Sequence, residues 1–216
     1  MGGGRGCLIA FEGADGVGKT TQVSRLADWL QQKGRSAKVV REPGGTPVGE
    51  AIRHVLLRPE HVMAPLTETL LFVAARHEVV ERVLRPALAQ GNVVLADRFT
   101  LSTVAYQHFG AGVPREQVEA LNQWATGGLT PDLTILLLAE QARRLNQDRM
   151  EQRADSFHDR VREGYLTLSR EHWEHTGPEG RCRLVVLARE GDADHVAAAV
   201  LDAVRPLLDG EGGRRA

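Results

Sequence analysis

The feature that most constrains the fold is a regular alternation of short apolar runs with stretches of helical periodicity. Runs typical of buried strands lie at 7–11, 37–42, 92–98, 132–138 and 183–188. Helical spacing predicts helices between them, at 21–34, 48–57, 66–88, about 100–108, about 115–126, up to about 174, and 192–208. Helices provide the crossovers that parallel strands require. We therefore predict an α/β protein with a doubly wound, five-stranded parallel sheet and helices on both faces.

A glycine-rich loop follows the first predicted strand. Residues 13–20, GADGVGKT, fit the pattern G-x-x-x-x-G-K-[ST] and lead directly into a predicted helix. In such a loop, backbone N–H groups and the positive end of the helix surround phosphate groups. Lys19 adds a charge for the β- and γ-phosphates, and the Thr20 hydroxyl suits Mg²⁺. We predict a nucleoside-triphosphate site formed by Gly13, Asp15, Gly16, Val17, Gly18, Lys19, Thr20 and Thr21.

The loop alone leaves open a switch, a motor or a kinase. A guanine-nucleotide switch needs an N-K-x-D element, which the chain lacks, and a motor is usually larger. Ligands gather at the carboxyl ends of parallel strands, where Arg41 and the pair Asp97–Arg98 are expected. Asp97 can hold Mg²⁺ through water, so Thr20 and Asp97 are the candidate metal residues. Asp15, a carboxylate inside a loop built for anions, indicates a second substrate nearby.

Composition restricts the cellular setting. The chain has 216 residues, 42% apolar and 25% charged, which favours one globular domain over 1–216, with 1–5 and 210–216 flexible. The net charge of −1 gives no basic field for nucleic acid. No apolar run approaches 18 residues, and the start, MGGGRG, lacks a signal-peptide core, so we expect a cytoplasmic protein without a membrane partner. Cys7 and Cys182 are interpreted as reduced core thiols.

Five motifs occur together in a fixed order: F-E-G-x-D-G-x-G-K-T-T, R-E-P-G-G-T, L-L-F-x-A-A-R, D-R-F-x-L-S-T-x-A-Y-Q and T-P-D-L-T, at 11–21, 41–46, 70–76, 97–107 and 130–134. From about residue 7 to about 175 the chain resembles the thymidylate kinases, nucleoside-monophosphate kinases with a fold of the P-loop NTPase type. The resemblance implies phosphorylation of dTMP to dTDP by ATP, with Mg²⁺, by in-line transfer in dTTP biosynthesis. It also implies a homodimer.

The resemblance implies a role for each residue of the acceptor site. Asp15 faces the 3′-OH, Arg41 and Arg98 hold the acceptor phosphate, and Phe72 stacks on thymine. Arg76 lies four residues after Phe72, so that its guanidinium projects beside the ring. The resemblance implies that this guanidinium hydrogen-bonds the base edge. Tyr106 lies against the sugar, where it crowds a ribose 2′-OH. The full dTMP-binding set is Asp15, Arg41, Glu42, Phe72, Arg76, Arg98, Ser102, Thr103, Tyr106 and Gln107. The family turn also implies a cis bond before Pro43.

A mobile cation is expected from a short Arg-rich lid at about 140–160. The loop interior, 14–17, contains no arginine, and the family then supplies one from the lid. The order D-R-x-E at 148–151 favours Arg149, with Arg153, Arg144 and Arg143 as further candidates and Arg160 in the same cluster. The predicted catalytic residues are Lys19, Asp15, Arg98 and Arg149. The segment is shorter than in lid-arginine members and lacks their L-D-x-x-P-E.

Two alternatives remain open at this point. The first is a P-loop kinase of another acceptor, such as a deoxynucleoside or a UMP/CMP-type kinase. A deoxynucleoside kinase acts on a neutral 5′-OH and has no need of Arg41 and Arg98. The second is a nucleotide-binding regulatory protein that turns over poorly, which only the shortened lid favours.

Overall fold

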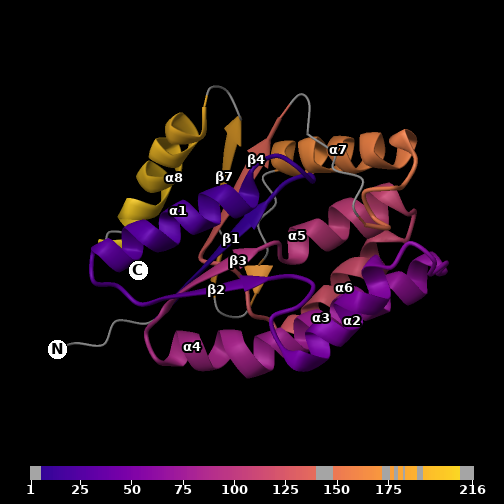
Figure 1. Cartoon of the computed structure of the whole chain (residues 1–216), viewed down its shortest axis with the longest axis horizontal. Helices are drawn as coiled ribbons and strands as arrows, with labels where there is room; N and C mark the ends of the chain where they lie inside the picture. The colour runs from indigo at the N-terminus through magenta and orange to yellow at the C-terminus, as the bar shows by residue number, and fades with distance from the viewer. Residues whose placement is uncertain are drawn as a thin grey trace.

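The central element is a five-stranded sheet whose strands are all parallel, in the order β2-β3-β1-β4-β7 (Figure 1). The computed structural model describes residues 6–139, 148–171, 176–177, 180–181, 183–188 and 192–209. The strands are β1 (Cys7–Glu12), β2 (Ala37–Arg41), β3 (Val93–Asp97), β4 (Leu133–Leu138) and β7 (Arg183–Ala188). The predicted fold class is confirmed, and each predicted strand is present.

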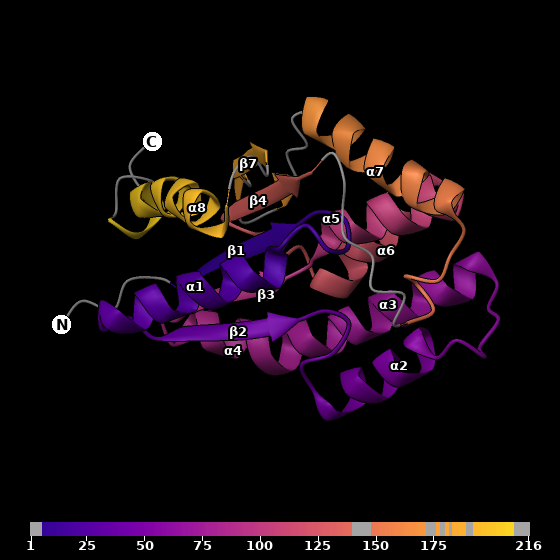
Figure 2. The same ribbon diagram turned by 45° about the horizontal axis from the view of Figure 1, so that its top comes forward.

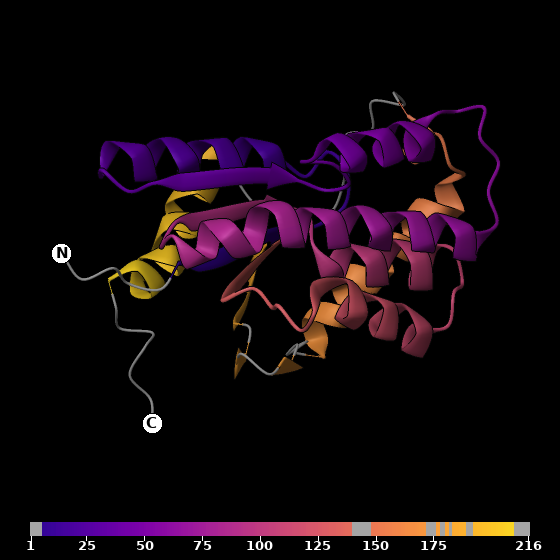
Figure 3. The same ribbon diagram turned by 90° about the horizontal axis from the view of Figure 1, so that it is seen from below.

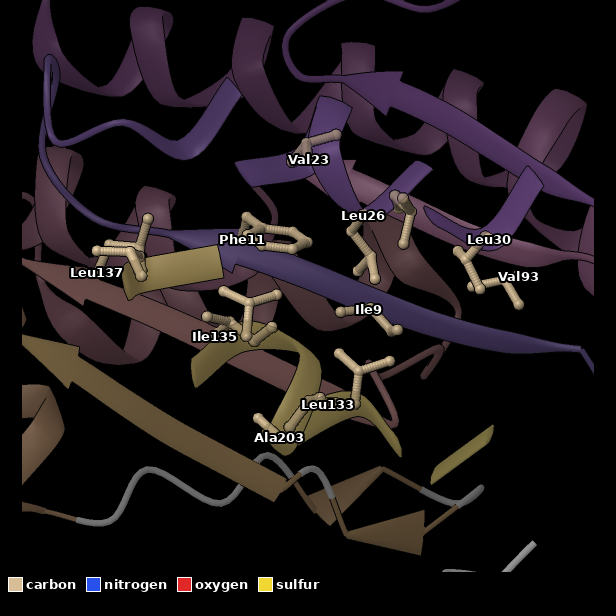
Figure 4. Close-up of a cluster of buried hydrophobic side chains, with 14 of the residues drawn as sticks. Ile9, Phe11, Val23, Leu26, Leu30, Val93, Leu133, Ile135, Leu137 and Ala203 are labelled. Atoms are coloured by element: carbon tan, nitrogen blue, oxygen red, sulfur yellow. The ribbon is translucent and has the colours of Figure 1, made fainter. Parts of the chain in front are cut away.

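One face of the sheet is covered by α1 (Lys19–Gln32) and α8 (Ala193–Leu208), which lie side by side (Figures 1 and 2). Alternate residues of β1, such as Ile9 and Phe11, point to this side together with Leu133 and Ile135 of β4. They pack against Leu26 and its neighbours on α1 (Figure 4). The period of two along each strand therefore sends every second side chain into this core.

The opposite face carries the remaining helices (Figure 3). They are α2 (Pro47–Leu57), α3 (Pro65–Val79) with its π-helical continuation η1 (Val80–Leu84), α4 (Arg85–Ala89), α5 (Thr100–Thr103) with the π-helix η2 (Val104–Gly110), α6 (Arg115–Thr126) and α7 (Asp155–Arg170). Leu8 and Ala10 of β1 pack against η1 and α4, whereas Leu136 of β4 packs against η2 and α7. Helices thus cover both faces, as predicted.

Two predicted helices are more irregular than their periodicity indicated. The helix predicted at 66–88 runs through α3, η1 and α4, and the π-helical turns come just before Pro86. Because proline has no N–H to donate, the regular hydrogen-bond pattern cannot continue through it. The helix predicted at about 100–108 is one turn of α5 followed by η2, which extends to Gly110.

The region after α7 also differs from expectation. The helix predicted to reach about residue 174 ends at Arg170, and a two-stranded antiparallel sheet follows, β5 (Thr176–Gly177) with β6 (Gly180–Arg181). Strands of two residues have no periodicity that a sequence pattern can reveal.

Several predicted features lie outside the described residues. They are the lid segment 140–147 with Arg143 and Arg144, Cys182, and the ends 1–5 and 210–216. Cys7 is only partly buried, at the start of β1, and burial raises the pKa of its thiol to about 11. Within the described ranges, no helix is both long and apolar enough to span a membrane.

Candidate active site

The phosphate loop joins β1 to α1, and two of its glycines are required by its shape. Gly13 has φ +134°, and a Cβ there would lie 2.4 Å from the carbonyl oxygen of Leu137 on β4. Gly18, with φ +98°, precedes the first residue of α1. Other residues rarely adopt such conformations. The loop therefore lies tightly against the end of the sheet, with the α1 N-terminus behind it.

Lys19 is buried inside this loop. Its Nζ donates hydrogen bonds to the carbonyl oxygens of Gly13 and Ala14, at 3.0 and 2.8 Å. Burial, and then the charge of Arg98, lowers the pKa of Lys19 to about 8, although nearby carboxylates led by Asp15 oppose the shift. The ammonium group is thus held where the loop backbone surrounds it.

Thr20 and Asp97 meet at the ends of α1 and β3. The Thr20 hydroxyl donates to Asp97 Oδ2 at 2.6 Å. No group of three or more His, Cys, Asp or Glu side chains able to hold a metal ion occurs among the described residues. A hydroxyl and one carboxylate nevertheless fit Mg²⁺, which takes its other ligands from phosphates and water.

Val17 and Thr21, two further residues of the predicted triphosphate site, differ in burial. Val17 is buried in the core that Ile9 and Phe11 form, so its side chain packs the loop onto the sheet. Thr21 is exposed on the first turn of α1.

Arg98 connects the loop to the helical side of the molecule. Its backbone has φ +75°, and its guanidinium donates to Gly13 O at 3.1 Å and Tyr106 OH at 3.1 Å, and also to Asp15. Tyr106 OH donates to the other Asp15 oxygen at 2.6 Å. Burial favours a raised pKa for Asp15, but Arg98, Lys19 and these hydrogen bonds outweigh it and lower the pKa to about 2. The structure therefore brings three predicted site residues, Asp15, Arg98 and Tyr106, into one hydrogen-bonded group.

Glu12, which the sequence analysis did not single out, organises the turn after Arg98. Its buried carboxylate accepts the backbone N–H of Phe99 at 2.9 Å and of Ser102 at 3.2 Å, and the Ser102 hydroxyl at 2.5 Å. Burial raises the pKa of Glu12, while the hydrogen bond from Ser102 opposes the shift. The hydroxyl of Tyr165, on α7, lies 2.9 Å from the Ser102 hydroxyl oxygen and accepts a hydrogen bond from Arg98 Nη1 at 3.3 Å. Glu12 lies in the F-E-G motif and could have been found there, whereas Tyr165 has no sequence signal.

Arg76 is buried, and four of its N–H groups have acceptors among the described residues. It donates from Nε to Glu42 at 2.7 Å, from Nη1 to Thr103 and Asn122 at 2.6 Å each, and from Nη2 to the Phe99 carbonyl at 2.9 Å. These partners, Glu42, Thr103, Asn122 and Phe99, come from segments distant in sequence from Arg76. Burial raises the pKa of Glu42 to about 7, with Arg76 opposing the shift. The Glu42–Pro43 bond is cis, as the family turn implied.

A cavity opens between β2, α2, α3, η2 and the start of the segment at 148. Its described lining is Asp15, Glu42, Pro43, Arg53, Leu57, Phe72, Arg76, Arg98, Ser102, Thr103, Tyr106, Gln107, Asp148 and Met150. Nine of the ten residues predicted to bind dTMP are among them. The exception is Arg41, which is exposed and whose Nη2 lies 3.9 Å from Oε2 of Glu50.

Arg53 of α2 is a cation of the cavity that sequence reasoning missed. Its Nη1 donates to the Pro43 carbonyl at 3.0 Å. Burial, and then the charge of Arg41, lowers the pKa of Arg53. An arginine on an amphipathic helix has no motif to distinguish it, so only the fold reveals its position.

The described lid arginines contact helices rather than the phosphate loop. Arg149 and Arg153 both donate to Glu68 of α3, at 2.6 and 2.5 Å. Arg149 also donates from Nε to the Leu56 carbonyl at 2.7 Å. Arg160 donates to the carbonyl of Gly110, at 2.7 Å from Nη2. In this arrangement these arginines anchor the segment at 148–160 to α2, α3 and η2.

Comparison with known proteins identifies the family. The model of the thymidylate kinase family matches residues 11–176. The chain belongs to the thymidylate kinase family. A thymidylate kinase of Deinococcus radiodurans is 42% identical over 207 residues, which cover 93% of this chain and 97% of that protein. One of Exiguobacterium is 46% identical over 177 residues, covering 78% and 84%.

A solved structure agrees with this assignment. The crystal structure of thymidylate kinase from Ehrlichia chaffeensis has a TM-score of 0.75 at 30% identity, covering 94% of this chain and 99% of that one. As a thymidylate kinase, the chain is an enzyme that phosphorylates dTMP in nucleotide synthesis. The alternatives of a kinase for another acceptor and of a regulatory protein that turns over poorly are therefore set aside.

Proposed function

We propose that the enzyme transfers the γ-phosphoryl group of ATP to dTMP in a Mg²⁺-dependent, in-line reaction of dTTP biosynthesis. One observation carries this proposal: Asp15 of the phosphate loop lines the cavity, and Arg98, which also lines the cavity, donates hydrogen bonds to Gly13 and Asp15 of the loop. Two nucleotides bound on either side of this pair have their phosphates next to each other, which in-line transfer requires. No covalent intermediate with the protein is needed.

The donor side consists of the loop residues Gly13 to Thr21. Their N–H groups and the α1 N-terminus bind phosphate oxygens, and Lys19 balances the charge of the β- and γ-phosphates. Thr20 and Asp97 hold Mg²⁺, which neutralises charge on the phosphates when it is bound. The Thr20–Asp97 hydrogen bond at 2.6 Å supports this pairing of a hydroxyl and a carboxylate.

The acceptor side is the cavity. Phe72 stacks on thymine, and Arg76 and Gln107 face the base edge, with Ser102 and Thr103 beside it. Arg98 binds the phosphate, and Arg53 supports it from α2, while Arg41 lies farther out. The Tyr106 ring lies against the sugar, where a 2′-OH would meet it. Support comes from the common cavity that these residues line, Arg41 excepted.

Arg149 leads the candidates for the lid cation, with Arg143, Arg144 and Arg153 as the others. To stabilise the transferred group, Arg149 must exchange Glu68 and the Leu56 carbonyl for phosphate oxygens. The exchange replaces one carboxylate contact and one neutral carbonyl contact of the guanidinium with contacts to phosphate oxygens.

We further propose a cytoplasmic homodimer formed through α3 and α6. Leu66 and Leu70, four residues apart on one side of α3, are each 47% exposed, and Trp124 of α6 is 78% exposed. α3 packs between α2 and α6. Large exposed apolar side chains on neighbouring helices are typical of protein interfaces.

The test is a coupled assay of ADP release with ATP, with and without Mg²⁺, and the acceptors dTMP, dUMP, dCMP, UMP, AMP and thymidine. We expect a Mg²⁺-dependent reaction that prefers dTMP and does not use thymidine. Lys19→Ala should abolish turnover. Arg98→Ala should chiefly weaken dTMP binding, by a few kcal/mol, because the acceptor phosphate then loses its main guanidinium partner and keeps only Arg53. Equal use of thymidine and dTMP would contradict the role of Arg98.

A further inference from the structure

Glu68, in the first turn of α3, is a fully buried carboxylate with a function that the sequence does not suggest. Its two oxygens have different partners. Oε2 accepts from Arg149 at 2.6 Å and from Arg153 at 2.5 Å, whereas Oε1 accepts from Nε2 of Gln107 at 3.2 Å. The two guanidinium groups balance the buried charge and fix the plane of the carboxylate, so that Oε1 is directed at Gln107.

This contact determines which way the Gln107 amide is turned. An ionised carboxylate only accepts hydrogen bonds, so it pairs with the amide nitrogen and not with the amide oxygen. Gln107 is buried and also lines the cavity. With its nitrogen held by Glu68, Gln107 has its amide oxygen left as an acceptor for a base in the cavity.

Arg76 provides a donor in the same cavity. Within the described part of the chain, four of its five N–H groups have protein acceptors, which leaves one on Nη2. Gln107, which carries this acceptor, and Arg76, which carries this donor, both line the cavity. Thymine and uracil present the matching edge, a donor at N3–H and an acceptor at O4. Cytosine presents the opposite pattern, an acceptor at N3 and a donor at N4.

We propose that Glu68 is a positioning residue that determines base specificity, because it fixes the Gln107 amide for pyrimidines that carry N3–H and against cytosine. This inference rests on the proposed binding of dTMP in the cavity. It assigns Glu68 no contact with the substrate, since the carboxylate acts through Gln107.

The test compares kcat/KM for dTMP and dCMP in the wild type and in Glu68→Gln. A glutamine at 68 can accept or donate, so the Gln107 amide can turn and present its nitrogen to cytosine. We expect the dTMP-to-dCMP ratio of kcat/KM to fall about tenfold, the effect of one hydrogen bond. Gln107→Met should lower the ratio similarly, and adding Glu68→Gln to it should lower the ratio no further.

Arg153→Met is the matched control. It removes a partner of Glu68 and leaves the Glu68–Gln107 contact in place, so it should change the rates with dTMP and dCMP by the same factor. Because Glu68→Gln leaves two guanidinium groups beside an uncharged partner, the charge-matched double variant Glu68→Gln/Arg153→Met repeats the test with one cation fewer.

The outcomes separate this inference from the proposed function. If the wild type prefers dTMP and both Glu68 variants keep that preference while their rates fall on both acceptors, Glu68 is only structural and the inference is overturned. If the wild type uses dCMP as well as dTMP, the inference fails while dTMP phosphorylation stands. A wild type that binds dTMP outside the cavity, shown by unchanged affinity in Gln107→Met and Phe72→Ala, overturns both.

Discussion

At the scale of single residues, Lys19 is expected to make the affinity for ATP depend on pH. In the free enzyme its pKa is about 8, because burial and Arg98 oppose its charge, whereas a bound triphosphate favours the charged form. Below pH 8 the lysine is charged in both states. Above pH 8 nucleotide binding must take up a proton, so affinity should fall by up to about tenfold per pH unit.

Calorimetry of ATP binding in buffers of different ionisation enthalpy measures this uptake. We expect about one proton per ATP at pH 9 and close to none at pH 7. Lys19→Arg is the control, since an arginine stays charged throughout this range. Equal uptake by the two proteins at pH 9 would show that another group titrates.

The buried ion pair Arg76–Glu42 leads to a second prediction, which concerns the stability of the folded protein. Arg76→Met removes the guanidinium and leaves the carboxylate of Glu42 and the side chains of Thr103 and Asn122 without their donor. We expect the free energy of unfolding, from urea denaturation, to fall by about 3–5 kcal/mol. Arg82→Met is the control, because the exposed pair Arg82–Glu78 should contribute about 1 kcal/mol or less. A similar decrease in both variants would contradict this account.

At the scale of elements, the junction between β1 and α1 depends on Gly13. An alanine there would have both a positive φ and a Cβ 2.4 Å from the backbone of β4, which cannot move without disturbing the sheet. We expect Gly13→Ala to destabilise the protein by well over the ~1 kcal/mol of backbone strain alone, and to weaken ATP binding. Gly34→Ala is the matched control, since Gly34 also has positive φ (+70°) but has open space around it. The decrease in the temperature of thermal unfolding is compared between the two variants. Equal decreases would show that the close contact between a Cβ at position 13 and the Leu137 carbonyl has no effect on stability.

Elements also show what the sequence could predict. The strands were predictable because buried parallel strands are continuous apolar runs, as in 132–138. The π-helical shape of η2, which carries Tyr106 and Gln107, was not predictable, because the helical periodicity of the sequence does not distinguish a π-helix from an α-helix. The site followed a similar rule. Residues inside motifs, such as Asp15 and Arg98, could be predicted as candidates. Arg53, Tyr165 and Glu68 reach the candidate site only through contacts between distant segments.

At the scale of the whole molecule, the proposed dimer makes a further prediction. Leu66→Glu/Leu70→Glu introduces two charges on the exposed side of α3 and should convert a dimer into a monomer, as measured by sedimentation or light scattering. Val186→Glu is the control, because Val186 is similarly exposed, at 40%, but lies on β7, at the edge of the sheet. A wild type that is monomeric, or a double variant that stays dimeric, would rule out this surface as the interface.

The pairing of Arg98 with Asp15 has a consequence for inhibitors. In the free enzyme the guanidinium already has a carboxylate partner, and Tyr106 holds that carboxylate in place. A phosphate analogue that binds Arg98 must compete with Asp15, so its gain is only the difference between two ionic interactions. An uncharged compound that fills the thymine end of the cavity and leaves the pair intact avoids that competition. The free enzyme is therefore a better template for uncharged inhibitors than for mimics of the nucleotide's phosphate.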